Sequence, residues 1–298
     1  MSQKITVSVD GEVGADKRVS RKASDNPRVK KLIEHTIEHG YVIIENAFTK
    51  AEVEETKAEL ARIARSPDAG PAAAHGRNSF EGLKTSRIYS LLNKSKDFEK
   101  YVIHPDILAL NDYFLDPAYL LNSYHSVSIQ PGEDPQTIHQ DDGSILIERP
   151  HRPFGTAIMV ALDEYTATNG STVIIPKSHN WGSDRLPKRS EAEPVIMPAG
   201  SVVFFVGTLY HGGGKNTSDT TRHALTVQYC QPWVRPVENQ ILAVDWDKIN
   251  DMPPQLVDLL GFKVGRPFIG HVDGRSPRTA LPRIVSNLAK LEQLGAKL

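Results

Sequence analysis

The stretch "SVVFFVGTLYHGGG", residues 201–214, decides the fold. Its apolar run from Val202 to Val206 consists only of β-branched and aromatic residues, which predicts a β-strand. His211 follows this strand, and the three glycines after it allow other backbone segments to approach closely. The stretch therefore predicts a strand that ends in a residue able to bind a metal or a proton.

Similar short β-rich runs lie on both sides of this strand. Turn signals separate them, among them Asn-Gly at 169–170 and Pro-Ala-Gly-Ser at 198–201. The runs are "AYLLNSYHSVSIQ", "GTAIMVALDEY", "STVIIP" and "HALTVQYCQPW". A series of short strands that follows helices predicts an all-β core with flanking helices, and we place a sandwich or barrel at about 119–235.

Helices are expected before and after the strands. Residues 29–40 predict the first helix, with an apolar stripe and Gly40 at its end. A strand at 41–48 follows, and Thr49 with Glu52 forms a capping box that opens the second helix. The stripe of the first helix consists of Val29, Leu32, Ile33 and Ile37, and the remaining helices are expected at 96–114 and 282–294.

The domain organisation follows from the same pattern. Residues 1–26 are polar and predict a flexible N-terminal arm, and residues 27–298 show no linker, which predicts a single domain. Residues 66–82 form a Gly-, Ala- and Pro-rich stretch without periodicity. Because long loops of this kind in compact proteins are usually functional or disordered, we expect this one to act as a lid.

Composition excludes several classes of partner. The net charge of −1 and the pI near 6.8 speak against nucleic acid and against an anionic membrane surface. The single cysteine, Cys230, fits a reducing compartment, and no apolar run is long enough to span a membrane. The final residues Ala296, Lys297 and Leu298 differ by one residue from a peroxisomal address, so we expect a cytoplasmic protein with the peroxisome as the alternative.

The segment "TIHQDDG", residues 137–143, predicts a metal site. His139 and Asp141 are two positions apart at the end of a strand, so their side chains point to the same face. This spacing favours Asp141 over Asp142 as a ligand, although a solvated turn has the same composition. The pattern also occurs a second time, as His271 and Asp273.

A second histidine decides between the two pairs. A non-haem iron oxygenase needs two histidines and one carboxylate on one face of the metal. His211 can complete the set with His139 and Asp141, whereas no histidine follows His271, which we expect in a surface turn. The other histidines have simpler expectations: His35 and His39 exposed on a helix, His179 holding a loop, and His223 beside Arg222 without being a ligand.

Arg222 lies eleven residues after His211 and opens the strand "RHALTVQYC". It is either an exposed charge at a strand end or a guanidinium that binds a dicarboxylate through two hydrogen bonds. Its place after the second histidine favours the binding role. Tyr229 lies on the same strand, and we expect it to pack in the core rather than face the site.

Taken together, these residues resemble the phytanoyl-CoA dioxygenase family of Fe(II)- and 2-oxoglutarate-dependent oxygenases, over roughly residues 28–240. The resemblance rests on "HQD", "TNGSTVIIPKSH", "PAGSVVFF", the distal histidine with its glycines, and "RHALTVQY" before "PWVRPVENQ". It implies a double-stranded β-helix, also called a jelly roll or cupin-like fold. It further implies ferrous iron, 2-oxoglutarate and dioxygen, with His139, Asp141 and His211 as the iron ligands and Arg222 at the distal carboxylate.

The chain is most similar in character to fungal members of this family that tailor natural products. In those members further 2-oxoglutarate contacts come from an arginine, a glutamine and a threonine, which match Arg87, Gln136 and Thr172 here. Each also has a simpler interpretation: a helix-end charge, a loop amide and an ordinary strand residue. The resemblance also implies a homodimer.

The expected function is therefore oxidation of an unactivated C–H bond in a small apolar natural product such as a terpenoid or an alkaloid. One alternative is the hydroxylation of an acyl-CoA or another primary metabolite. The only dense basic cluster that could bind its phosphates is at 17–22, inside the predicted arm. A second alternative is a jelly-roll protein that binds its ligand without turnover, and a third is a zinc hydrolase, which lacks an obvious general base.

Overall fold

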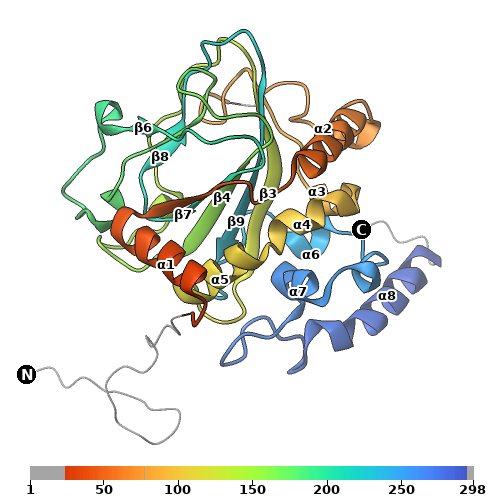
Figure 1. Ribbon diagram of the computed structural model, residues 1–298. Coiled ribbons are helices and arrows are strands. Elements are labelled where there is room, and N and C mark those ends of the chain that lie inside the picture. The colour runs from red at the N-terminus through yellow and green to blue at the C-terminus, as the bar shows by residue number, and fades with distance from the viewer. Residues whose placement is uncertain (1–23, 77, 294–298) are drawn as a thin grey trace, which may run out of the picture.

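The computed structural model describes residues 24–76 and 78–293. Two antiparallel sheets make up its centre (Figure 1). Most of the predicted arm at 1–26 lies outside the described residues, and so does the tripeptide at 296–298. None of the described helices combines the length and the apolar character needed to cross a membrane.

The larger sheet has six strands in the order β1-β7-β4-β9-β3-β2. All neighbouring strands are antiparallel, and β9 lies between β3, which pairs with it from Arg222 to Cys230, and β4, which pairs with it from Ala224 to Cys230. The strands are β1 (Tyr41–Ile44), β2 (Thr85–Ser86), β3 (Leu120–Ile129), β4 (Gly155–Ala161), β7 (Val202–Val206) and β9 (Arg222–Cys230). The sheet therefore takes in β1 and β2 from the helical part of the chain, outside the predicted core at 119–235.

The smaller sheet has three strands in the order β6-β5-β8. They are β5 (Thr172–Ile174), β6 (Glu193–Pro194) and β8 (His211–Gly213). The chain reaches β8 directly from β7, which is buried at every position, so the apolar run delivers His211 from one sheet to the other.

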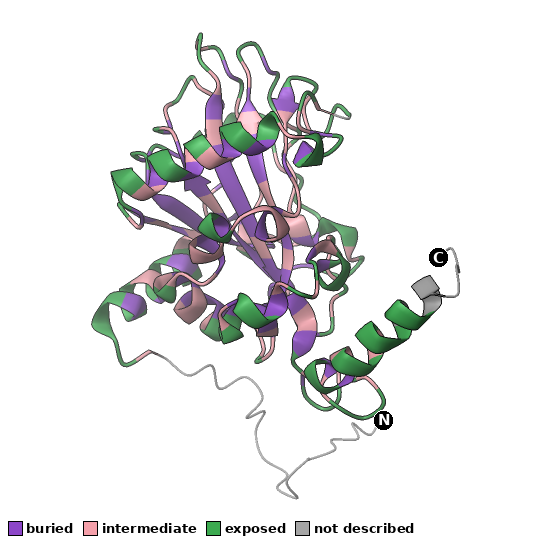
Figure 2. Ribbon diagram, turned by 90° about the vertical axis from the view of Figure 1, so that its right-hand side faces the viewer, coloured by how far each residue is buried: buried purple, intermediate pink, exposed green. Residues whose placement is uncertain are grey.

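Helices cover the outer face of the larger sheet (Figures 1 and 2). The hydroxyl of Tyr124 on β3 donates to the Phe98 carbonyl at 3.0 Å, and that of Tyr229 on β9 donates to the Val102 carbonyl at 2.7 Å. Tyr229 thus packs between sheet and helices, as its sequence position predicts. The helices are α1 (Pro27–His39), α2 (Lys50–Ala64), α3 (Leu91–Lys94), α4 (Glu99–Val102), α5 (Pro105–Phe114), α6 (Gln240–Ala243), α7 (Pro254–Val257) and α8 (Pro277–Gln293).

Three helix predictions were wrong in detail. The single helix expected at 96–114 is broken, because the residue before Pro105 is kept out of the helical region and α5 begins at the proline. In α1 the buried stripe runs through Val29, Ile33 and Thr36, whereas Ile37 is 47% exposed. The C-terminal helix begins at Pro277, five residues earlier than expected, and contains Pro282. The capping box of α2 was predicted correctly.

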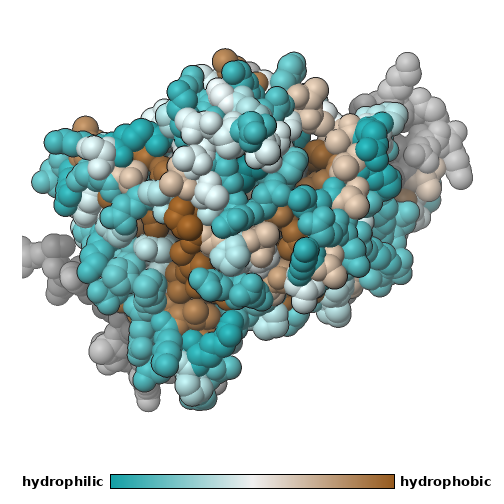
Figure 3. Space-filling model, turned by 45° about the horizontal axis from the view of Figure 1, so that its top comes forward, coloured by the Kyte–Doolittle hydropathy of each residue, from teal (hydrophilic) through white to brown (hydrophobic). Residues whose placement is uncertain are grey.

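The end of the molecule that carries the long loops is turned forward in Figure 3. Hydrophobic side chains gather there in narrow strips bordered by hydrophilic ones, so this face offers no broad apolar patch.

Candidate active site

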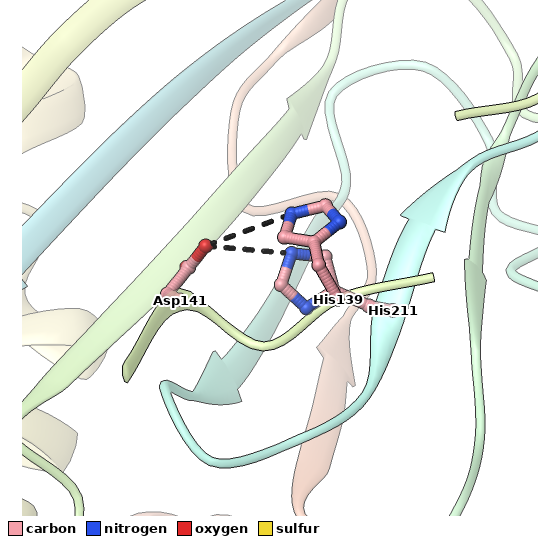
Figure 4. A group of neighbouring side chains, drawn as sticks. All are labelled: His139, Asp141 and His211. Carbon is pink, nitrogen blue, oxygen red and sulfur yellow. Dashed lines mark ion pairs between the residues drawn. The ribbon is translucent and has the colours of Figure 1, made fainter. Parts of the chain in front are cut away.

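Three side chains from two distant segments converge between the sheets (Figure 4). One ligand atom from each of His139, Asp141 and His211 lies within 4.8 Å of the others. The Oδ1 atom of Asp141 is 3.9 Å from Nε2 of His139 and 3.7 Å from Nε2 of His211. This is the group expected from the sequence, and among the described residues no other cluster of this kind occurs.

Backbone pairing brings the two histidines together. The amide of His139 donates to the His211 carbonyl at 2.9 Å, and the amide of His211 donates back at 2.8 Å. Residues paired in this way face each other across antiparallel strands, and the two imidazole centroids are 4.4 Å apart. Pairing therefore fixes the separation of the two rings independently of any bound ion.

The two imidazoles are oriented by the same local device. Nδ1 of His139 lies 2.9 Å from the Thr137 carbonyl, and Nδ1 of His211 lies 3.0 Å from the Leu209 carbonyl. Because a carbonyl only accepts, Nδ1 carries the proton in both rings, and the Nε2 lone pairs point to Asp141. Histidine ligands of metals are commonly oriented in this way.

Burial also keeps His139 ready for a metal. Desolvation, followed by the nearby His211, lowers the pKa of His139 to about 4. The ring is therefore neutral near pH 7, and a metal does not have to displace a proton from it.

The donor set suits a divalent transition metal. Nitrogen and carboxylate ligands bind such ions at about 2.0–2.2 Å, so two ligands of one ion lie at most about 4.4 Å apart. The two distances from Asp141 Oδ1 meet this limit. Two imidazoles and one carboxylate are typical of non-haem iron(II) and leave coordination positions open.

Arg222 is buried, not exposed at a strand end. Its Nη1 donates to the Tyr165 hydroxyl at 2.9 Å, and its Nη2 donates to the Gly170 carbonyl at 2.5 Å. Its Nε is buried without a hydrogen-bond partner among the described residues. A buried guanidinium with an unused donor that lines the same cavity as the triad suits a carboxylate ligand.

The other three predicted cofactor contacts also line this cavity of about 780 Å³. The Gln136 side chain accepts from the Gly213 amide at 3.0 Å, which leaves its NH₂ group for a ligand. Thr172 is buried on β5. Arg87 follows β2 rather than ending a helix, and it donates to the Glu81 carbonyl.

The competing pair and the other histidines have structural roles. His271 and Asp273 are exposed in a turn where the Gly274 amide donates to Nδ1 of His271 at 3.0 Å. His35 is exposed, and His179 contacts the Ile37 carbonyl through Nε2 at 3.0 Å, which ties its loop to α1. These findings confirm the surface turn and the loop contact.

Sequence reasoning missed several residues around the triad. Gln228 donates to Oδ2 of Asp141 at 3.2 Å, and the ring centroid of Phe80 lies 5.0 Å from that of His139. Gln228 could have been found, because Arg222, Thr226 and Gln228 have even spacing on β9 and all three line the cavity. No periodicity could have indicated Phe80, which lies in the loop expected to be a lid.

The protein-family comparison matches residues 37–224 to the phytanoyl-CoA dioxygenase (PhyH) model. The chain is 29% identical over 256 residues to the dioxygenase FUM3 of Gibberella moniliformis, which covers 82% of this chain and 85% of that protein. It is 32% identical over 184 residues to the dioxygenase swnH1 of Metarhizium robertsii, with 58% of each chain covered.

Solved structures share the fold at lower sequence identity. The non-heme alpha ketoglutarate dependent carbocyclase SnoK from nogalamycin biosynthesis aligns with a TM-score of 0.56 at 19% identity, over 72% of this chain and 89% of that chain. HygX from Streptomyces hygroscopicus, with nickel and 2-oxoglutarate bound, aligns with a TM-score of 0.56 at 16% identity, over 70% and 89%. These likenesses confirm the predicted double-stranded β-helix. Since the family model matches more than half of its residues, the chain belongs to the phytanoyl-CoA dioxygenase family.

Proposed function

We propose that this protein is an Fe(II)- and 2-oxoglutarate-dependent dioxygenase that oxidises an unactivated C–H bond of a small natural product. The observation that carries the proposal is the meeting of the His139, Asp141 and His211 ligand atoms in the cavity that Arg222 also lines. The family and the dioxygenases among its relatives support it.

The residues divide the work within the cavity. His139, Asp141 and His211 would hold iron, and Arg222 would bind the distal carboxylate of 2-oxoglutarate. Gln136, Thr172 and Arg87, which line the same cavity, would position the rest of this cosubstrate. When bound, ferrous iron and 2-oxoglutarate would supply the electrons that activate dioxygen, which side chains cannot provide. The sheets position the reactants and keep bulk water out.

The lining of the cavity narrows the substrate class. The β3–β9 register puts Ile129 opposite Arg222 at one end and Ser123 opposite Gln228 at the other. Polar side chains gather at this second end of the cavity; they are Tyr89, Asn122, Ser123, His125 and Gln228. A substrate with hydrogen-bonding groups of its own could contact these polar side chains, whereas a hydrocarbon could not. The cavity thus favours an alkaloid or an oxygenated terpenoid over a wholly apolar molecule.

Natural-product chemistry also agrees with the structural relatives. SnoN in complex with Fe3+, alpha ketoglutarate and nogalamycin RO aligns at 20% identity with a TM-score of 0.55, over 69% of this chain and 84% of that chain. HygX has also been solved with hygromycin B bound. Two proteins of this fold have thus been solved with a small molecule bound, which supports a small-molecule substrate for this chain.

The charge of the cavity lining speaks against the acyl-CoA alternative. The basic residues among its described lining are Arg87 and Arg222, and Arg222 lies at the end assigned to 2-oxoglutarate. This leaves little positive charge for the phosphates of an acyl-CoA.

A cytoplasmic or peroxisomal homodimer remains our proposal for the location and assembly of the protein.

Turnover of 2-oxoglutarate tests the proposal. Purified protein supplied with Fe(II), 2-oxoglutarate and air is expected to form succinate, and omission of iron or oxygen should stop it. Addition of alkaloids and oxygenated terpenoids should stimulate succinate formation where one of them is a substrate. A protein that binds Fe(II) and 2-oxoglutarate but never forms succinate would instead be the binding protein of the second alternative.

A further inference from the structure

Gln228 lies where the metal cluster meets the substrate end of the cavity. Its Nε2 donates to Oδ2 of Asp141 at 3.2 Å. The other carboxylate oxygen, Oδ1, is the one that faces His139 and His211. The two oxygens of Asp141 therefore have separate partners.

The sheet fixes the position of this amide. Gln228 pairs with Ser123 on β3 and with Ala157 on β4, so strands on both sides hold its backbone. Its side chain lies on the same face of β9 as Arg222 and Thr226 and lines the cavity. The donor thus comes from a strand that is paired on both sides, whereas Asp141 comes from a short 3-10 turn.

The neighbouring carboxylate shows why a separate donor matters. Asp142 uses its own Oδ2 to accept from the Phe154 amide at 2.8 Å, which ties it to the protein backbone. Asp141 has no such backbone tie among the described hydrogen bonds; Gln228 is the donor to its carboxylate there. Without that donor, Oδ2 would be able to turn towards the metal.

A carboxylate can bind a metal through one oxygen or through both. If Asp141 used both, it would occupy one of the positions that a two-histidine, one-carboxylate site keeps open for other ligands. A hydrogen bond from an amide to Oδ2 engages that oxygen and turns it away from the ion. The consequence is a metal with more open positions.

We propose that Gln228 is a positioning residue that holds Asp141 in one-oxygen coordination. This inference rests on the proposed function in one respect only, namely which ligand takes the open coordination position of the metal. Gln228 itself contacts no metal in this role; it acts through Asp141. Gln228 also lines the end of the cavity that we assign to the substrate. The same side chain therefore lies beside the metal ligand Asp141 and beside the proposed substrate site.

Cobalt(II) titration of Gln228→Met tests this role without the need for a substrate. Methionine keeps the length of the side chain but lacks the amide donor. Loss of an outer partner of a metal ligand typically weakens metal binding about 10–100-fold, which we expect here. The visible absorption of the cobalt protein should also change to that of a higher coordination number. Gln255→Met, the same change at an exposed position of α7 outside the cavity, is the matched control and should leave both readouts unchanged.

The outcomes are distinguishable. Cobalt affinity within about threefold of wild type, together with an unchanged spectrum, would overturn the role of Gln228. If Gln228→Met loses its metal-free melting transition, Gln228→Leu replaces it, because leucine also lacks the amide donor, and the same two readouts apply. A wild-type protein that binds cobalt but not 2-oxoglutarate would overturn the proposed function and leave the Gln228 comparison intact. A wild type that binds no cobalt would overturn both.

Discussion

At the scale of single residues, the site depends on side chains that keep a donor or an acceptor free after they have made hydrogen bonds within the protein. Each triad histidine uses Nδ1 on a carbonyl two residues earlier, which leaves Nε2 for the metal. Arg222 donates one N–H from each terminal nitrogen, to Tyr165 and to Gly170, and its Nε has no partner among the described residues. Residue type and spacing indicated these three residues as candidates. Partners such as Tyr165 could not be predicted, because they depend on how β9 faces a loop far away in the sequence.

Arg222→Lys is expected to weaken 2-oxoglutarate binding about 10–100-fold, because lysine keeps the charge but loses the planar set of donors. The measurement is anaerobic titration of the Fe(II) protein with 2-oxoglutarate. Cobalt affinity should stay at the wild-type value, since no described contact joins Arg222 to the triad. Equal 2-oxoglutarate affinity in the variant and the wild type would remove Arg222 from the site.

At the scale of elements, alternation and capping predicted most strands and the first two helices. The errors have physical causes: Pro105 ends one helix and starts another, and α1 turns Thr36 inward, where its hydroxyl is satisfied by the Leu32 carbonyl at 2.8 Å. The lid expected at 66–82 stays a prediction. Its end reaches the cavity through Phe80, whose place depends on loop contacts that the sequence pattern does not reveal.

The end of α1 offers an element-scale prediction. Gly40 caps the helix with φ +86°, and an added Cβ would lie 2.5 Å from Nδ1 of His179 and 2.6 Å from Cδ1 of Leu209. Gly40→Ala should therefore lower the free energy of unfolding by about 2–4 kcal/mol, from backbone strain and steric overlap together. Gly274→Ala is the control, because Gly274 also has a positive φ, +71°, but no atom within 4 Å of the added Cβ.

Urea unfolding of both glycine variants measures the difference. Gly274→Ala should show only the cost of the positive-φ backbone, about 1–2 kcal/mol. If Gly40→Ala costs no more than Gly274→Ala, the side chains of His179 and Leu209 do not oppose the added methyl group.

At the scale of the whole molecule, Arg222 lies at the end of the cavity that we assign to 2-oxoglutarate, and Gln228 lies at the polar end that we assign to the substrate. The fold class followed from the succession of short strands and from the family resemblance. The residues at the substrate end could not be predicted from the sequence, because the strand register decides which residues face inward. That register is why we propose an alkaloid or an oxygenated terpenoid rather than a wholly apolar substrate.

Acid stability is a property of the whole chain that His139 should influence. Unfolded histidine titrates near pH 6.5, whereas burial lowers the pKa of His139 to about 4. Between these values the unfolded state binds more protons. The stability from neutral His139 is therefore present above pH 6.5 and is lost as the pH falls towards 4. The metal-free protein should lose about 1 kcal/mol from this group between pH 7.5 and 5.5.

His139→Asn is the comparison, because its amide can replace the Nδ1 donor but does not titrate. Subtraction of the two urea-unfolding profiles should cancel other groups, including Asp142, whose pKa burial raises to about 7 and which acts in the opposite direction. Wild type should lose more stability than His139→Asn as the pH falls. Parallel profiles would mean that His139 is protonated as readily in the folded state as in the unfolded state.

The central claim is that His139, Asp141 and His211 hold one ferrous ion beside 2-oxoglutarate. The most direct test is iron-dependent succinate formation by His211→Ala, with His271→Ala as the control for an equal loss of imidazole from a surface turn. We expect His211→Ala to lower the rate more than about 100-fold and His271→Ala to leave it unchanged. A His211→Ala protein that forms succinate at the wild-type rate would contradict the claim.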